Sequence, residues 1–159
     1  MRGKRKYILL ILFLFGFKRN EKIGVSYHGE ILAKYDGNLF LTSKGFLLKI
    51  SDKRIIDSLS KKNLPEIIGV DMSNEHDSFR MNSFLYPVSE LLKRIKDTES
   101  KFYSEIKYVE PLKISIYTHN EKLIIFGLGR FDKKIRYLTE IEDFKDTLNL
   151  EILSFLERR

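Results

Sequence analysis

The chain has 159 residues, 29 Lys and Arg against 22 Asp and Glu, a formal net charge of +7 and no cysteine. Without cysteine these residues can form no disulfide bond, thiolate metal site, cysteine nucleophile or lipidated N-terminal cysteine. Most of the net positive charge lies in residues 1–22, which contain 7 basic residues and 1 acidic residue. Residues 23–159 are therefore close to neutral, which disfavours a nucleic-acid-binding surface on the folded part.

One long apolar segment lies between basic clusters at residues 2–6 and 18–22. This arrangement is typical of a membrane anchor, because the cations face anionic lipid head groups and fix which end stays in the cytoplasm. The anchor residues expected in the lipid are Tyr7, Ile8, Leu9, Leu10, Ile11, Leu12, Phe13, Leu14, Phe15 and Phe17. As a helix, the segment spans roughly 16 Å, about half of the ~30 Å hydrocarbon core.

The short apolar segment leaves open whether it spans the membrane, lies in the interface or is cleaved. A retained anchor would need Lys6 and Lys18 to extend toward the lipid head groups and the bilayer to thin. A signal peptide also has a basic start and a short apolar region, but Gly16 is followed by Phe17 and Lys18 rather than by a small-residue cleavage pattern. Either account places the remaining chain outside the cytoplasm. With a retained anchor, the N-terminus lies in the cytoplasm and the anchor in the inner membrane.

The first part of the body is expected to form a three-stranded meander, a short helix and a fourth strand. Glycines in the turns at residues 36–37 and 43–45 provide the positive φ that tight hairpins need. Ser51 is a plausible N-cap for the helix, and Leu64-Pro65 would end it. The expected strands are Ile31–Tyr35, Leu39–Thr42, Phe46–Ile50 and Glu66–Val70, and Ser73–Tyr86 is interpreted as a polar loop.

The second part shows the clearest helical period, which starts at Pro87. The apolar positions of this helix are Val88, Leu91, Leu92, Ile95 and Phe102. Strand 106–110 follows, and then a hairpin over residues 112–127: apolar and polar residues alternate over residues 113–117, residues 119–121 form the turn, and residues 123–126 form the returning strand. A second long helix is expected from Asp132 onward, and a last strand, Leu150–Leu156, closes the chain. The inner face of that second helix is expected to contain Tyr137, Leu138, Ile141, Phe144 and Leu148.

These elements predict an α+β fold: one domain over residues 23–159 with a mostly antiparallel sheet and helices packed mainly on one face. Residues 1–22 would form the cytoplasmic stub and anchor. The last strand has no later strand to pair with. At a sheet edge it would present unpaired backbone groups to another chain.

No catalytic, cofactor or metal motif is found. The three histidines are 48 and 43 residues apart, without metal-ligand spacing. The cluster Asp71, Glu75, His76 and Asp77 lacks the glycine and glutamate of an EF-hand, and Asp132 stands where a dinucleotide-binding loop beginning at Gly127 needs its third glycine. The sequence therefore predicts a protein that is not an enzyme and binds no cofactor, metal or small-molecule substrate.

Two stretches resemble the FtsQ/DivIB family of bacterial cell-division proteins. Residues 64–69, Leu-Pro-Glu-Ile-Ile-Gly, are similar to the family's L-P-x-x-x-G element, and residues 128–132, Leu-Gly-Arg-Phe-Asp, are similar to its L-G-R-x-D element. The order of meander, helix, hairpin and last helix also matches. Two features differ: the family's POTRA domain is missing between the anchor and the meander, and Leu153 stands where the family has arginine.

The resemblance implies a membrane-anchored scaffold of the divisome, the cell-division machinery that builds the septum. Its partners would be division proteins of the FtsB/DivIC and FtsL type, and its last strand would accept a partner segment by strand addition. The partner-binding residues would then be Ile152, Leu153, Ser154, Phe155 and Leu156.

Three alternatives remain open. In the first alternative, the residues of the last strand simply complete the hydrophobic core. The second is an envelope transport or assembly module of POTRA-like type that has no role in division. The third is a hydrolase that uses the loop from Asp71 to Asp77, and this activity would require a metal.

Overall fold

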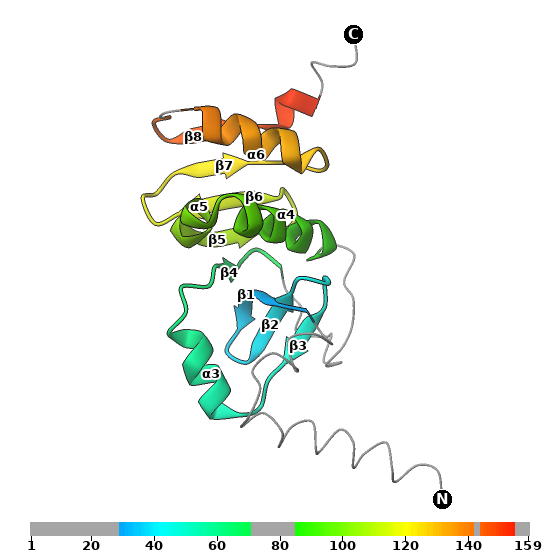
Figure 1. Ribbon diagram of the computed structural model, residues 1–159, viewed down its shortest axis with the longest axis vertical. Helices are drawn as coiled ribbons and strands as arrows, with labels where there is room; N and C mark the ends of the chain where they lie inside the picture. Colours follow the sequence, from blue (N-terminus) through cyan, green and yellow to red (C-terminus); the bar gives the residue numbers. More distant parts are fainter. Residues whose placement is uncertain (1–28, 71–84, 142–143, 155–159) are drawn as a thin grey trace, which may run out of the picture.

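The computed structural model describes residues 29–70, 85–141 and 144–154 (Figure 1). These residues form an α+β fold with one mixed eight-stranded sheet, in the spatial order β3-β2-β1-β4-β5-β6-β7-β8. The strands are β1 Ile31–Asp36, β2 Leu39–Thr42, β3 Leu47–Lys49, β4 Glu66–Ile67, β5 Ile106–Glu110, β6 Ser115–Thr118, β7 Leu123–Ile125 and β8 Thr147–Asn149. The helices are α3 Lys53–Ser60, α4 Leu85–Thr98, α5 Ser100–Glu105 and α6 Phe131–Glu140, and a 3-10 helix, η2, covers Glu151–Ser154.

The predicted α+β class is confirmed, and the sheet is mixed. Four of its seven strand pairings are antiparallel. The other three, β1 with β4, β4 with β5 and β7 with β8, are parallel. Each parallel pair is separated in sequence by at least one helix, because a strand can return in the same direction only through a long crossover. Local patterns predicted the hairpins and could not reveal these crossovers.

Most elements of the first two thirds lie where the sequence predicts them. The meander, the helix after Pro87, strand β5 and the β6–β7 hairpin are confirmed with small shifts at their ends. Helix α3 is capped by Asp52 rather than by Ser51, since the Asp52 carboxylate accepts a hydrogen bond of 2.9 Å from the backbone N–H of Arg54. Phe102 lies in the separate short helix α5 and is half-buried against the core.

Three of the four α-helices in the described residues cover one face of the sheet. Figure 1 shows α4 and α5 in front of β5 and β6, and α6 in front of β7 and β8. Leu91 and Leu138 belong to the same core cluster as Ile116 and Ile124 of the sheet. Helix α3 is separate from this layer. Its buried Leu59 lines a hollow together with Phe40 of β2, and neither residue belongs to the main core cluster. Because successive residues of a strand point to opposite faces of the sheet, Phe40 and helix α3 lie on the face opposite to the main cluster.

The C-terminal third differs most from the prediction. Helix α6 ends at Glu140, and its buried residues are Phe131, Lys134, Ile135 and Leu138. Tyr137, predicted to face inward, is 42% exposed. The predicted strand from Leu150 to Leu156 is wrong over Glu151–Ser154, which form η2; the real last strand, β8, precedes it.

Several predictions fall on residues that the structure does not describe. They concern the anchor, the loop from Asp71 to Asp77, and the final residues Phe155 and Leu156. Within the described ranges, no helix is long and apolar enough to cross a membrane.

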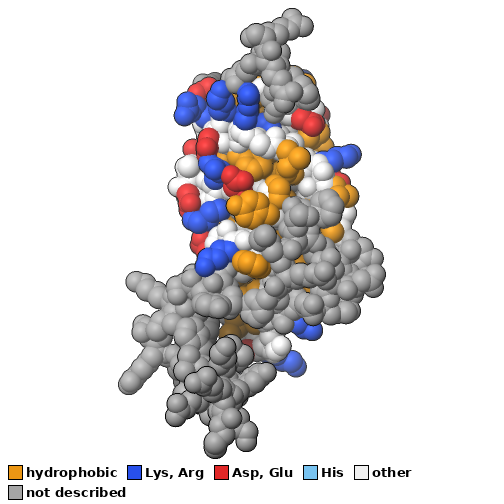
Figure 2. Space-filling model, turned by 90° about the vertical axis from the view of Figure 1, so that its right-hand side faces the viewer, with side chains coloured by type: hydrophobic (Ala, Val, Ile, Leu, Met, Phe, Trp, Pro, Cys, Tyr) orange, Lys and Arg blue, Asp and Glu red, His pale blue; other side chains and the backbone are white. Residues whose placement is uncertain are grey.

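One side of the molecule exposes several hydrophobic side chains. Figure 2, which views the right-hand side of Figure 1, shows them in the centre, with Lys and Arg grouped at the upper left. Leu112 (62%), Leu128 (70%) and Ile152 (54%) are the most exposed large hydrophobic residues described. Leu112 follows β5, Leu128 follows β7 and Ile152 follows β8, so all three lie just beyond the ends of parallel strands.

Candidate partner-binding edge

Strand β8 forms one edge of the sheet. Its inner side pairs with β7, in the register Leu123 with Thr147, Ile124 with Leu148 and Ile125 with Asn149. Two further backbone bonds of 2.8 Å extend this ladder, from Leu123 N–H to the Asp146 carbonyl and from Leu150 N–H to the Ile125 carbonyl. In a parallel ladder, alternate residues bond to the same neighbour. The N–H and C=O of Thr147 and Asn149 therefore point outward, where no described strand pairs with them.

The side chains of β8 explain why it stays at the edge. Leu148 is half-buried against the core, whereas Thr147 and Asn149 are exposed. The strand is short because the Asn149 side-chain oxygen accepts a hydrogen bond of 3.0 Å from the backbone N–H of Glu151. This local bond turns the chain into η2 and competes with further strand pairing.

The predicted partner-binding residues lie just past this edge strand. Ile152 is exposed, Leu153 is half-buried against the core, and both belong to η2, as does Ser154. Their predicted alternation along a strand is thus absent, although they remain adjacent to the edge. Sequence reasoning missed the edge residues Thr147 and Asn149. The polar–apolar–polar order of residues 147–149 was the available signal, but three residues are too few to distinguish a strand from a loop.

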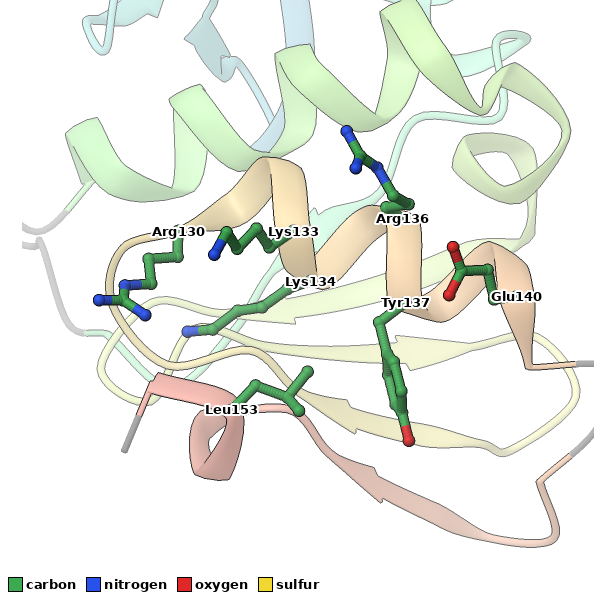
Figure 3. Close-up of a pocket in the computed structure, with 7 residues that line it drawn as sticks. All are labelled: Arg130, Lys133, Lys134, Arg136, Tyr137, Glu140 and Leu153. Carbon is green, nitrogen blue, oxygen red and sulfur yellow. The ribbon is translucent and has the colours of Figure 1, made fainter. Parts of the chain in front are cut away.

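A groove of about 320 Å³ lies between α6 and η2, beside β8. It will be called the α6–η2 groove. Its lining residues are Arg130, Lys133, Lys134, Arg136, Tyr137, Glu140 and Leu153. Figure 3 shows Arg130, Lys133 and Lys134 pointing to the same side, the Tyr137 ring and Leu153 bordering the opening, and Arg136 pointing away. The groove therefore combines a cationic end with an apolar wall.

The buried cation in the groove is Lys134. Its ammonium donates hydrogen bonds to the carbonyls of Phe126 (2.6 Å) and Leu128 (3.1 Å), and the residue is 1% exposed. Burial lowers the pKa of Lys134; the Glu151 carboxylate opposes this change, and the Arg130 charge adds to it. Two carbonyl acceptors stabilise the ammonium, so Lys134 fastens α6 to the chain that leaves β7.

Backbone geometry shapes the cationic end of the groove. Gly127 has φ +60°, and a side chain there would come within 2.9 Å of the Glu151 Cγ. A glycine at this position therefore lets the loop approach η2 closely. Arg130 also has a positive φ, 53°, and directly precedes the first residue of α6. This turn directs the Arg130 side chain toward the groove, beside Lys133 (Figure 3).

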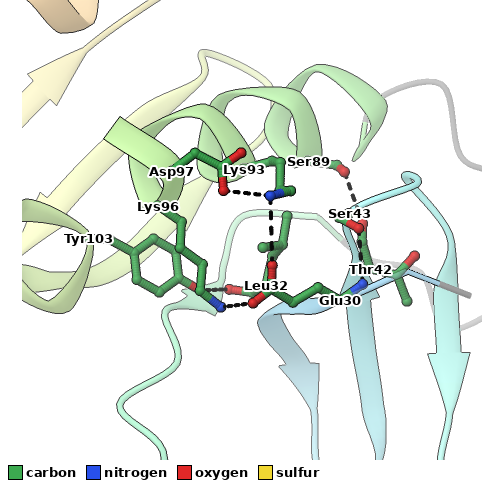
Figure 4. A network of polar contacts seen from close by, with 9 residues as sticks. All are labelled: Glu30, Leu32, Thr42, Ser43, Ser89, Lys93, Lys96, Asp97 and Tyr103. Atoms are coloured by element: carbon green, nitrogen blue, oxygen red, sulfur yellow. Dashed lines mark hydrogen bonds and ion pairs between the residues drawn. The ribbon is translucent and has the colours of Figure 1, made fainter. Parts of the chain in front are cut away.

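A second polar cluster connects the start of β1 with α4 (Figure 4). Lys93 and Lys96 form ion pairs with the Glu30 carboxylate, and the Ser89 hydroxyl donates a hydrogen bond of 2.8 Å to the Thr42 carbonyl. The Tyr103 hydroxyl donates to the Leu32 carbonyl. These groups pair with one another within the fold. The cluster therefore holds α4 and α5 against β1 and β2, and we assign it no ligand-binding function.

The described residues contain no group of three His, Asp or Glu side chains arranged to hold a metal ion. Comparison of the chain with models of protein families, with curated proteins and with solved structures found no match. The functional assignment therefore depends on the edge strand, the groove beside it and the resemblance of two short motifs.

Proposed function

We propose that this chain is a non-enzymatic, membrane-anchored scaffold of the bacterial divisome, of the FtsQ/DivIB type. It binds small division proteins of the FtsB/DivIC and FtsL type by strand addition at β8. The observation that carries this proposal is the edge position of β8, whose outward backbone groups are paired with no described strand. Strand addition uses such groups for affinity and alternate side chains for specificity.

Two further features support the assignment. The segment that resembles L-P-x-x-x-G, residues 64–69, contains β4, and the segment that resembles L-G-R-x-D, residues 128–132, connects β7 to α6. The first segment thus provides the strand that lies between β1 and β5, and the second begins the crossover from β7 to β8. In this proposal the basic N-terminus stays in the cytoplasm, the apolar segment holds the chain in the inner membrane, and residues 23–159 meet their partners outside the cytoplasm.

The strength of strand addition alone can be bounded. The two outward residues of β8, Thr147 and Asn149, offer two N–H and two C=O groups, and each hydrogen bond contributes about 1 kcal/mol net. Association costs about 4–15 kcal/mol in lost freedom of motion. Backbone pairing at β8 therefore sets the position of a partner segment, and side-chain contacts must supply the rest of the affinity.

A proline substitution at the edge tests the proposal. Thr147→Pro removes an outward N–H at the first residue of a strand, a position that tolerates proline, and leaves the pairing with β7 in place. Lys49→Pro is the matched control, because Lys49 is the exposed last residue of β3 at the opposite edge. Each full-length variant would be expressed with an affinity tag, and co-purified membrane proteins would be identified.

The expected result is that the unmodified chain and Lys49→Pro recover equal amounts of division proteins of the FtsB/DivIC and FtsL type, whereas Thr147→Pro recovers several-fold less, as one lost hydrogen bond of about 1 kcal/mol requires. Near-ultraviolet circular dichroism of each variant would establish that the fold is intact. Equal recovery with Thr147→Pro would refute strand addition at β8. Recovery of secretion machinery without enrichment at midcell would instead favour the envelope transport or assembly module.

A further inference from the structure

The edge strand and the α6–η2 groove are neighbours in both sequence and space. Strand β8 ends at Asn149, η2 begins at Glu151, and Leu153 of η2 lines the groove. Because side chains alternate along a strand, a segment added to β8 would direct every second side chain toward the helix layer, where this groove opens. The side chains in between would lie on the other face of the sheet, the face on which the Thr147 and Asn149 side chains lie.

The groove has a strong excess of positive charge. Three of its cations, Arg130, Lys133 and Lys134, point to the same side of the groove, whereas the fourth lining cation, Arg136, points away (Figure 3). Glu140 is the only acidic lining residue, and the Glu151 carboxylate of η2 also acts on Lys134. Glu140 lies at the opposite end from Arg130 and Lys133 (Figure 3). The Lys134 ammonium, fixed by two carbonyls beneath them, adds a charge that cannot move away. Carboxylates are the side chains that complement such a cluster, by charge and by hydrogen bonding.

We infer that the segment that pairs with β8 is acidic: it places a carboxylate side chain at the cationic end of the α6–η2 groove and an apolar side chain against Tyr137 and Leu153. This inference rests on the proposed strand addition and deepens it. A three-residue edge cannot discriminate among partners by its backbone, so the groove selects the partner. Complementary charge also accelerates association and fixes the register.

Synthetic peptides of alternating sequence test the inference directly. Three fluorescent hexapeptides would be compared, with alternating Val-Glu, Val-Gln and Val-Lys, binding to the full chain in detergent followed by anisotropy. We expect the Val-Glu peptide to bind about tenfold more tightly than the Val-Gln peptide and the Val-Lys peptide to bind least. The difference between the first two should narrow at ~0.5 M salt.

The matched variants are Arg130→Glu/Lys133→Glu and Lys53→Glu/Lys61→Glu. Both change the net charge equally, and the second pair lies at the exposed ends of α3, away from the groove. The groove variant should lose the preference for Val-Glu, and the α3 variant should keep it. Equal loss in both variants, or equal binding of Val-Glu and Val-Gln to the unmodified chain, would overturn the inference.

Thr147→Pro separates this inference from the proposed function. If Thr147→Pro weakens the binding of all three peptides while the unmodified chain shows no preference among them, strand addition stands and the acidic partner is refuted. If Thr147→Pro binds the Val-Glu peptide as tightly as the unmodified chain does, the groove binds carboxylates without strand addition, and the proposed mechanism fails. Binding to vesicles containing phosphatidylglycerol that only the groove variant loses, without any peptide preference, would identify a membrane surface as the occupant instead.

Discussion

The Tyr103 hydroxyl donates a hydrogen bond to strand β1 at a position where the strand has a bulge. Ile31 pairs with Thr42 and Ala33 with Leu41, so Leu32 is an extra residue between two ladder positions of β1. Leu32 is fully buried, and its carbonyl accepts a hydrogen bond from the Tyr103 hydroxyl of α5 (Figure 4). Because the bulge disturbs the ladder here, we expect this hydroxyl to stabilise the sheet as well as the helix.

Tyr103→Phe should reduce the free energy of unfolding by about 2 kcal/mol. The substitution keeps the ring and removes one hydrogen bond, which leaves a buried carbonyl without that donor, a change that costs about 1–3 kcal/mol. For a chain of this size the melting temperature should fall by roughly 4–8 °C. Urea titration followed by circular dichroism measures the change. A loss below about 0.5 kcal/mol would show that Leu32 finds another donor and would refute the reasoning.

The same tyrosine should make stability fall at high pH. Burial, with a smaller contribution from the Glu30 charge, raises the pKa of Tyr103 above its usual value of 10. A group with a raised pKa contributes fully below the unfolded pKa and loses its contribution as pH rises through the folded one. The unmodified chain should therefore lose more stability than Tyr103→Phe between about pH 9 and pH 11. If the free energy of unfolding changed with pH equally in the unmodified chain and in Tyr103→Phe, the loss of stability could not be assigned to the buried Tyr103 hydroxyl.

Two further substitutions test the packing of the core and the groove. Leu91→Ala, in a side chain that is fully buried in α4, should cost about 2–5 kcal/mol through lost burial and a cavity, measured by urea titration. Lys134→Met should cost about 1–3 kcal/mol at neutral pH, because the carbonyls of Phe126 and Leu128 lose their shared donor. An unchanged or raised stability for Lys134→Met would mean that burying the ammonium costs as much as its hydrogen bonds provide.

The sequence predicted elements whose signal is local. In α4 the spacing of Val88, Leu91, Leu92 and Ile95 follows the helical repeat, and all four are buried. The β6–β7 hairpin was equally predictable, since residues 113–117 alternate, a short polar turn follows, and residues 123–126 are apolar. The parallel pairings of β4 and β8 were not readable, because they depend on which strands meet through helical crossovers, and no short pattern encodes that choice.

Helix α6 shows how a regular pattern can indicate only part of a buried face, since Leu138 is buried as predicted and Tyr137 is not. Tyr137, Ile141 and Phe144 fit a helical repeat, but the helix ends at Glu140 and Ile141 takes an extended backbone. The helix buries Lys134 instead, a residue that no hydrophobic pattern selects. Its burial is possible because the ammonium donates hydrogen bonds to two backbone carbonyls in the segment that follows β7. These hydrogen bonds depend on the tertiary structure, so no local sequence pattern predicts them.

The difference at the C-terminus changes how partner recognition should work. A seven-residue strand over residues 150–156 would have offered a long edge, with backbone pairing as the main source of affinity. The observed edge offers only Thr147 and Asn149, since the Asn149 side chain bonds to Glu151 N–H and starts η2. The turn brings Leu153 to the α6–η2 groove. In the proposed strand addition, a short edge beside a cationic groove is suited to a partner selected by its side chains. Charge reversal in the groove should then weaken binding of that partner as strongly as the loss of an edge N–H.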